Sequence, residues 1–308
     1  MAKAGKKFID LGERGKYSTK NKLNNLTGKE WIKFSKSWFI HRPPRRKENE
    51  LLHPAKFPET LIEEFISFFT KENAWILDPF MGTGSTLIAA GNIKRNAIGI
   101  ELSNKYYQTA RRRIDNQNYK SKLIPLNGSS AELTKVLNER KISKIKPCLP
   151  PACPVGRAGR FDYVITSPPY WNQLERNSLR QKSRSEQGLA TKYSNNKNDL
   201  GNIKSYDEFL EKLCLIFDNV YALTKDGSYL TIIINNIYFQ GQLYPLAFDL
   251  AGMLTKRNDK SWILKDEKIW LQNDKPLIAL GVNNAWVANR HHQYCLIFRK
   301  ERNKEIER

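Results

Sequence analysis

The pattern of apolar and polar positions predicts a sheet whose strands alternate with helices along the chain. Short apolar runs indicate buried strands at 74–78, 96–101, 123–126, 161–166 and 229–234. Helical spacing of apolar residues indicates helices at 85–93, 103–116, 131–138 and 206–223, and another that starts near Pro58. The chain closes with a helix at 243–254 and strand-like segments at 262–270 and 293–299. Strands and helices in regular alternation are typical of an α/β fold with a parallel sheet.

Two segments interrupt this alternation and are expected to be inserted functional loops. Segment 147–160 is rich in Pro, Gly and Arg, and segment 171–205 is polar and basic with little apolar periodicity. Residues 1–50 carry 14 Lys and Arg against 5 Asp and Glu, and we expect them to form a basic arm with one anchored apolar piece. The remaining chain, 51–308, is expected to form one domain that contains both loops.

The charge of the chain indicates a polyanionic partner. The 308 residues include 52 Lys and Arg against 31 Asp and Glu, a formal net charge of +21, and 40% of them are hydrophobic, which excludes general disorder. The proline-containing basic tract 41–47 is either a solvated linker or a direct phosphate contact.

The sequence also predicts where the protein works. No apolar run approaches the roughly 18 residues that a membrane span needs, and no secretory apolar region follows the first basic residues. The four cysteines are typical of a reducing compartment. We therefore expect a cytoplasmic protein without a membrane partner.

A glycine-containing turn after the first predicted strand of the sheet is a candidate cofactor site. The run Asp78-Pro-Phe-Met-Gly-Thr-Gly places Gly82 and Gly84 where the backbone can approach a ligand closely. Leu87 replaces the third glycine of the dinucleotide fingerprint, which argues against NAD or FAD. Glu101 ends the next predicted strand, where its carboxylate can accept hydrogen bonds from two ribose hydroxyls. A plain strand-to-helix turn is the alternative, and the placement of Asp78 and Glu101 on consecutive strand ends favours the cofactor site.

The run Ser167-Pro-Pro-Tyr is a candidate site for an amino group. It follows the fourth predicted strand and should project from the same sheet edge as the glycine turn. Pro168 and Pro169 fix the backbone and leave carbonyl oxygens without a local N–H competitor, beside the Ser167 hydroxyl. These acceptors can hold an exocyclic amino group while Tyr170 stacks on the ring that carries it. The alternative is a rigid proline turn with a packed tyrosine, which its position beside the glycine turn disfavours.

Together the two motifs resemble the S-adenosylmethionine-dependent amino DNA methyltransferases, which make N4-methylcytosine or N6-methyladenine. The resemblance covers about 53–299. It implies S-adenosylmethionine as the cofactor, held by His53, Lys56, Pro58, Asp78, Phe80, Gly82, Thr83, Gly84 and Glu101. Segment 126–130 departs from the family, which often has an acidic residue there near the adenine.

The resemblance also implies a fold and a mode of base recognition. The expected fold is a Rossmann-like, seven-stranded, mostly parallel sheet with helices on both faces and an antiparallel final strand pair. The cofactor motif precedes Ser-Pro-Pro-Tyr in this chain, whereas many family members with the same Ser-Pro-Pro-Tyr motif have the opposite order. Both motifs are still expected to meet at one edge of the sheet. Because the chain shows no separate carboxyl-terminal recognition domain, base readout is assigned to loop 171–205 and the basic arm.

The implied reaction is methyl transfer to the amino group of a flipped base in double-stranded DNA. Its catalytic residues would be Ser167, Pro168, Pro169 and Tyr170. Hydrogen bonds from the amino protons to Ser167 Oγ and the Pro168 carbonyl would raise the nucleophilicity of the nitrogen, so no catalytic cysteine is required. In the family, serine at the first position is more typical of cytosine N4 acceptors, so we expect cytosine, with adenine N6 as the alternative. A cognate restriction endonuclease is a candidate partner.

Other interpretations stay open. RNA and protein-glutamine methyltransferases also carry an aromatic residue after two prolines, although the glutamine enzymes would not need a charge of +21. A noncatalytic nucleic-acid-binding module could keep the same fold. Cys148 and Cys153 have the spacing of half a zinc site, but no second pair completes it, so we expect free thiols and no metal. Trp171, Asn172 and Gln173 either line the base pocket or pack the loop.

Overall fold

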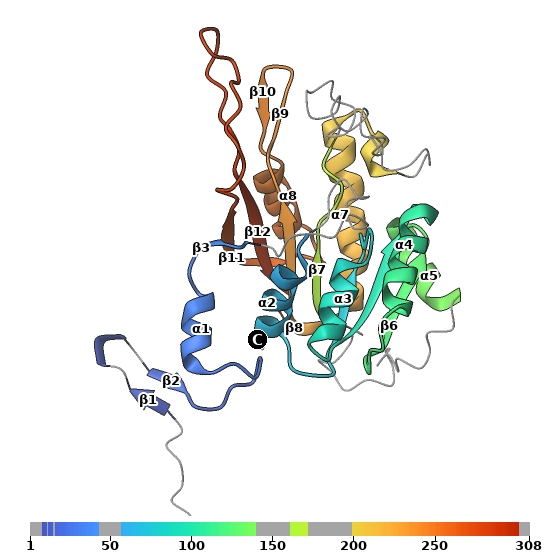
Figure 1. Cartoon of the computed structure of the whole chain (residues 1–308), viewed down its shortest axis with the longest axis vertical. Helices are drawn as coiled ribbons and strands as arrows, with labels where there is room; N and C mark the ends of the chain where they lie inside the picture. Colours follow the sequence, from blue (N-terminus) through green and yellow to red (C-terminus); the bar gives the residue numbers. More distant parts are fainter. Residues whose placement is uncertain are drawn as a thin grey trace, which may run out of the picture.

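An eight-stranded sheet forms the centre of the protein (Figure 1). The computed structural model describes residues 8–10, 12–14, 16–42, 57–139, 161–171 and 199–301. The strands, in sheet order, are β3 (Trp38–Ile40), β11 (Ile263–Leu271), β12 (His292–Arg299), β8 (Thr224–Ile234), β7 (Phe161–Thr166), β4 (Trp75–Asp78), β5 (Asn96–Glu101) and β6 (Leu123–Asn127). Strands β8, β7, β4, β5 and β6 are parallel, whereas β12 is antiparallel to both β8 and β11.

Helices cover both faces of this sheet. They are α1 (Gly28–Phe34), α2 (Glu59–Phe69), α3 (Ser85–Asn92), α4 (Asn104–Asp115), α5 (Leu133–Glu139), α7 (Tyr206–Leu223) and α8 (Leu246–Thr255). One apolar core contains the buried faces of α5, α7 and α8, and a second contains those of α2 and α3 with part of α4. Two cores are expected when each strand of a central sheet is apolar on both faces. The expected Rossmann-like α/β fold with an antiparallel pair near one edge is confirmed.

Short elements complete the described chain. They are the hairpin β1 (Phe8–Asp10) and β2 (Lys16–Ser18), the hairpin β9 (Ile237–Phe239) and β10 (Gln242–Tyr244), and the 3-10 turns η1 (Gly12–Arg14), η3 (Ser130–Glu132) and η5 (Leu200–Asn202). The helix expected at 243–254 begins at Leu246 instead, because Leu243 pairs with Tyr238 in the β9–β10 hairpin. None of the described helices is both long and apolar enough to span a bilayer.

The sheet has one strand more than the seven that were expected, because β3 pairs in parallel with the outer edge of β11. The Lys268 side chain on β11 fixes this connection, since its ammonium group donates to the carbonyl oxygens of Phe34 and Lys36. Aromatic packing adds to it, because the Phe34 and Phe68 rings stack with their centroids 4.0 Å apart. The division of the chain into an arm at 1–50 and a domain at 51–308 stays a prediction.

A buried hydroxyl pair links two neighbouring strands of the sheet. Tyr163 on β7 is fully buried, and its hydroxyl donates to Thr231 Oγ1 on β8 over 2.7 Å. Because a buried hydroxyl without a partner is destabilising, this bond satisfies both side chains. Strand β7 leads directly into Ser167, so the pair also fixes the strand that carries the acceptor motif.

Candidate functional site

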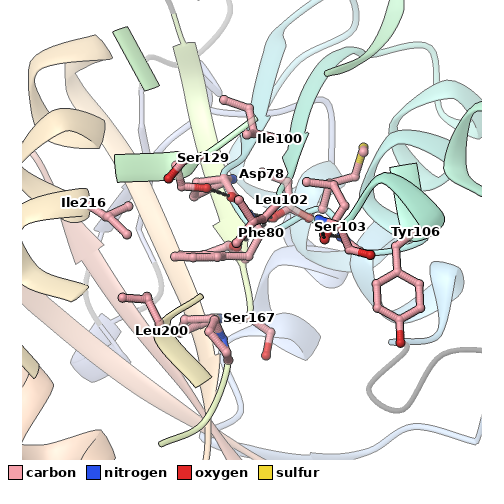
Figure 2. Close-up of a pocket in the computed structure, with 18 of the residues that line it drawn as sticks. Asp78, Phe80, Ile100, Leu102, Ser103, Tyr106, Ser129, Ser167, Leu200 and Ile216 are labelled. Atoms are coloured by element: carbon pink, nitrogen blue, oxygen red, sulfur yellow. Dashed lines mark hydrogen bonds between the residues drawn. The ribbon is translucent and has the colours of Figure 1, made fainter. Parts of the chain in front are cut away.

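A cavity of about 540 Å³ lies at the carboxyl ends of β4, β5 and β7 (Figure 2). Nine of the residues predicted from the sequence line it, namely Asp78, Phe80, Gly82, Thr83, Glu101, Ser167, Pro168, Pro169 and Tyr170. Pro58 and Gly84, the N-cap residues of α2 and α3, are described but do not line the cavity. His53 and Lys56 lie outside the described residues, as do loop 147–160 with Cys148 and Cys153, and most of loop 171–205 with Asn172 and Gln173.

The glycine turn, residues 78–84, forms one wall of the cavity. Gly82 and Gly84 have φ angles of 55° and 86°, in the left-handed region that glycine adopts without strain. A Cβ atom on Gly84 would lie only 3.0 Å from the Ala110 Cβ of α4. Arg113 braces the turn, because its guanidinium donates to the Thr83 carbonyl and to Glu59 Oε1, each over 2.6 Å. These contacts therefore fix the backbone of the turn where it lines the cavity.

Asp78 joins the glycine turn to the strand that carries the acceptor motif. Its Oδ1 accepts hydrogen bonds from Thr166 Oγ1 at 2.6 Å and from the Phe80 N–H at 3.0 Å, and its Oδ2 accepts one from Thr86 Oγ1 at 2.5 Å. Burial raises the pKa of Asp78, and these three bonds oppose that rise. Thr166 immediately precedes Ser167, so a single carboxyl group fixes the two motifs relative to each other.

Glu101 lies across the glycine turn and can still accept further hydrogen bonds. Its Oε2 accepts the Gly82 N–H at 2.9 Å, and its Oε1 accepts the Ser103 N–H at 2.7 Å. Burial raises the pKa of Glu101 to about 7; the two backbone bonds oppose this rise and the nearby Asp199 adds to it. A carboxylate has roughly four acceptor positions, so two remain for a pair of hydroxyl groups. These two acceptor positions fit the two ribose hydroxyls of S-adenosylmethionine.

The acceptor motif occupies the opposite side of the cavity. Figure 2 shows Ser167 from this motif and Phe80 from the glycine turn around the same space. The Tyr170 hydroxyl donates to Gln293 Oε1 on β12 over 3.1 Å, which fixes the ring. Burial raises the pKa of Tyr170, so its phenol is neutral at physiological pH.

Trp171 packs into the protein rather than lining the cavity. It is 4% exposed, and its indole N–H donates to the Lys204 carbonyl over 3.2 Å. Its ring lies 4.7 to 5.6 Å from those of Tyr206, Phe239 and Tyr244. Of the two interpretations of Trp171, the structure therefore supports loop packing. This aromatic group also connects the acceptor motif to the β9–β10 hairpin.

Some residues that line the cavity were not predicted from the sequence to be site residues. Asp199 is 5% exposed and lines the cavity, where its charge helps to raise the pKa of Glu101. Ser129 also lines the cavity, next to Ser130, whose hydroxyl donates to the Pro79 carbonyl of the glycine turn. These residues come from separate segments, and no motif connects them. Within the described part of the chain, no group of three His, Cys, Asp or Glu side chains could hold a metal ion.

Comparison with known proteins gives a match over most of the chain. The family model for N6 and N4 methyltransferases, described as DNA methylase, matches residues 1–112 and 161–307. The chain is 36% identical over 92 residues to the Type II methyltransferase M.BglI of Bacillus subtilis, a match that covers 30% of this chain and 26% of that protein. It is 42% identical over 66 residues to the Type II methyltransferase M2.DpnII of Streptococcus pneumoniae, covering 21% and 25% respectively. The matched stretches span about a quarter of these curated relatives.

A solved structure of similar extent also aligns with the chain. A methyltransferase from Pyrococcus furiosus aligns with a TM-score of 0.40 and 14% identity, covering 81% of this chain and 87% of that chain.

Proposed function

The chain belongs to the N6/N4 DNA methylase family, and from that premise we propose that it transfers a methyl group to the exocyclic amino group of a flipped base in double-stranded DNA. The cofactor is S-adenosylmethionine, whose sulfonium carries the methyl group that is transferred. We assign the glycine turn and Glu101 to the cofactor, and Ser167, Pro168, Pro169 and Tyr170 to the base. The cofactor contacts that the resemblance implies for His53, Lys56 and Pro58 stay predictions, and Pro58 does not line the cavity.

One observation supports this proposal above all others, namely that both motifs line one cavity. Its volume of about 540 Å³ lies within the range of sites for small molecules and cofactors. The bonds from Thr166 and Thr86 to Asp78 hold the two sides in a fixed relation. Methyl transfer needs the donor and the acceptor atoms in line at close distance, and a rigid connection between their binding sites provides this orientation.

The acceptor motif would activate the amino nitrogen without a strong base. Ser167 Oγ and the Pro168 carbonyl would accept hydrogen bonds from the two amino protons, which draws the nitrogen lone pair out of conjugation with the ring. Tyr170 would stack on the base, with its neutral hydroxyl held by Gln293. One amino proton then leaves along the Ser167 hydrogen bond to solvent once the new carbon–nitrogen bond has formed.

Within this proposal, cytosine N4 is the acceptor that we favour. The support is the serine at the first position of the acceptor motif, since the resemblance associates serine with cytosine and Asp or Asn with adenine. Double-stranded DNA as the partner is supported by the net charge of +21, because a strongly basic chain binds phosphate backbones. A cognate restriction endonuclease stays a prediction.

Mass spectrometry of nucleosides tests the reaction directly. Unmodified duplex DNA and RNA are each incubated with the purified protein and isotope-labelled S-adenosylmethionine, and are then digested. We expect label in N4-methylcytosine from DNA. Label in N6-methyladenine would keep the DNA methylase function and overturn the choice of base. Label only in RNA, or none despite measured cofactor binding, would overturn the proposed function.

The Ser167→Ala variant tests the role of the acceptor motif. Removing one acceptor of the amino protons should lower kcat by roughly 10²-fold or more, the scale of one polar catalytic contact, while cofactor affinity stays within about twofold. The matched control is Ser35→Ala, since Ser35 is an exposed residue after α1. An equal loss of cofactor affinity and turnover in Ser167→Ala would contradict the assigned role.

A further inference from the structure

A long projection leaves the sheet at the same edge as the acceptor motif. It comprises residues 272–291 between β11 and β12, and is called the β11–β12 arm below. Leu271 and His292 pair at its base, and Tyr294 on β12 pairs with Ile234 at the carboxyl end of β8. Figure 1 shows the arm beside the β9–β10 hairpin, at one end of the molecule. The hydrogen bond from Tyr170 to Gln293 connects the base of the arm to the acceptor motif.

The tip of the arm is apolar and carries no charge. Segment 276–289 contains no Asp, Glu, Lys or Arg, although the whole chain has a net charge of +21. Trp286 is 88% exposed and Leu277 is 80% exposed, the two highest values for large apolar side chains among the described residues. Lys275 and Arg290 lie on either side of this segment, nearer to the sheet. An apolar tip between two cationic residues is unusual for a surface that faces only water.

The arm has a defined shape even though it makes no regular strand pairing at its tip. The Asn289 side chain bonds both backbone groups of Ile278, accepting from its N–H and donating to its carbonyl, each over 2.9 Å. Gly281 has a φ angle of 65°, and a Cβ atom there would collide with the backbone of the turn. Arg290 lies over the Tyr238 ring at 5.3 Å, which joins the arm to the β9–β10 hairpin. Trp286 is therefore presented on a preorganised support.

We propose that the β11–β12 arm inserts Trp286 into the DNA duplex beside the target base, and that the Trp286 ring stacks in the space that the flipped base leaves. This inference rests on the proposed function. Apolar side chains inserted between base pairs unstack and kink DNA, and stacking on a base does not require a charge. Trp286 lies six residues from His292 at the base of the arm, a length of chain that reaches at most roughly 20 Å, which exceeds the major-groove depth of about 8.5 Å. Lys275 and Arg290 add positive charge at either side of the tip, and positive charge attracts the phosphate backbone.

The test compares paired and unpaired target bases. The methylated sequence is first mapped on unmodified duplex DNA with the wild-type protein, and two oligonucleotide substrates are then made. One is the perfect duplex, and the other has an abasic site opposite the target base, so that the base is already unpaired. For Trp286→Ala we expect roughly a 10- to 100-fold lower kcat/KM on the perfect duplex. On the abasic substrate we expect the rate to stay within about threefold of wild type.

Two further variants make the comparison specific. Trp286→Phe keeps an aromatic face and should recover most of the activity on the perfect duplex. Ile32→Ala removes an exposed apolar side chain on α1, 66% exposed and away from the arm, and should behave like the wild type on both substrates. Trp286 fluorescence, taken as the difference between wild type and Trp286→Phe, should be quenched when the perfect duplex binds.

Each outcome either supports the inference or overturns it. Trp286→Ala activity equal to wild type on the perfect duplex, or an equal loss on both substrates, would overturn it. A change in sedimentation mass of Trp286→Ala without DNA, with duplex activity intact, would assign the tip to a contact between protein chains instead. Failure of the wild-type protein to methylate either DNA would overturn the proposed function itself, which separates the two conclusions.

Discussion

Lowering the pH should weaken cofactor binding through one carboxyl group, that of Glu101. Burial raises its pKa to about 7 in the ligand-free protein. Only the ionised form is a pure acceptor that can bind two ribose hydroxyls in addition to its two backbone donors. Below pH 7 the free energy needed to ionise Glu101 increases by about 1.4 kcal/mol for each pH unit. Between pH 8 and pH 6 the ionised fraction falls about tenfold, so the affinity should fall about tenfold as well.

Isothermal titration calorimetry with S-adenosylhomocysteine between pH 5.5 and 8.5 measures this effect. The affinity should rise with pH and become nearly constant above about pH 8, with proton release on binding at pH 6. Glu101→Gln is the control, since it keeps the size of the side chain and does not titrate. A flat profile in the wild type, or the same slope in Glu101→Gln, would refute the reasoning.

The same carboxyl group has the opposite effect on folding of the ligand-free protein. Because its folded pKa of about 7 exceeds the ordinary value of 4.5, folding takes up a proton between these values. The stabilising contribution is therefore complete below about pH 4.5 and is lost as the pH rises through 7. The corresponding fall in the free energy of unfolding is on the order of 3 kcal/mol. The raised pKa of Asp78 acts in the same direction.

Four single substitutions test the structure around the site, between β7 and β8, and in the β11–β12 arm. Gly84→Ala forces a left-handed φ on a residue with a Cβ and should lower the unfolding free energy by about 2 kcal/mol in thermal denaturation, with weaker cofactor binding. Tyr163→Phe and Thr231→Val should each destabilise the protein by about 1 to 3 kcal/mol, whereas the double variant should lose less than their sum in a double-mutant cycle. Asn289→Ala should leave the global unfolding transition unchanged while hydrogen exchange at the Ile278 amide becomes faster, and unchanged exchange there would contradict the assigned bracing role.

The parallel strands could be predicted from the sequence because each contains a short apolar run, although β8 begins at Thr224 rather than at 229 because its first half is polar. The boundaries of β5 and β7 agree with those expected, and β4 begins one residue later than expected. Strand β3 could not be recognised, since it has three residues and none is fully buried. Its pairing depends on the contacts of Lys268, more than 220 residues later in the chain. The β9–β10 turn contains Gly241, with a φ angle of 79°, but its strands are too short for a periodic signal.

The site could be predicted only where its residues are consecutive. The glycine turn and the acceptor motif are continuous, so their chemistry is visible in the sequence. Asp199 and Gln293 take part through tertiary contacts alone: one enters the cavity from a polar loop, and the other bonds Tyr170 from the far end of the chain. The exposure of Trp286 is also a property of the folded arm, since a tryptophan among valines and leucines usually indicates a core.

The short strand β3 has a consequence for solubility. A sheet ends in strands whose outer N–H and C=O groups can pair with another molecule, and this is a common route to aggregation. Here one outer strand is β3, which offers only three residues, and the other is β6, which contains Pro125 and lacks one donor there. Strand β3 pairs with Ile269–Leu271 of the nine-residue β11 and covers that end of its outer edge. The end of the β11 edge that lies nearest the site is therefore closed to pairing with another molecule.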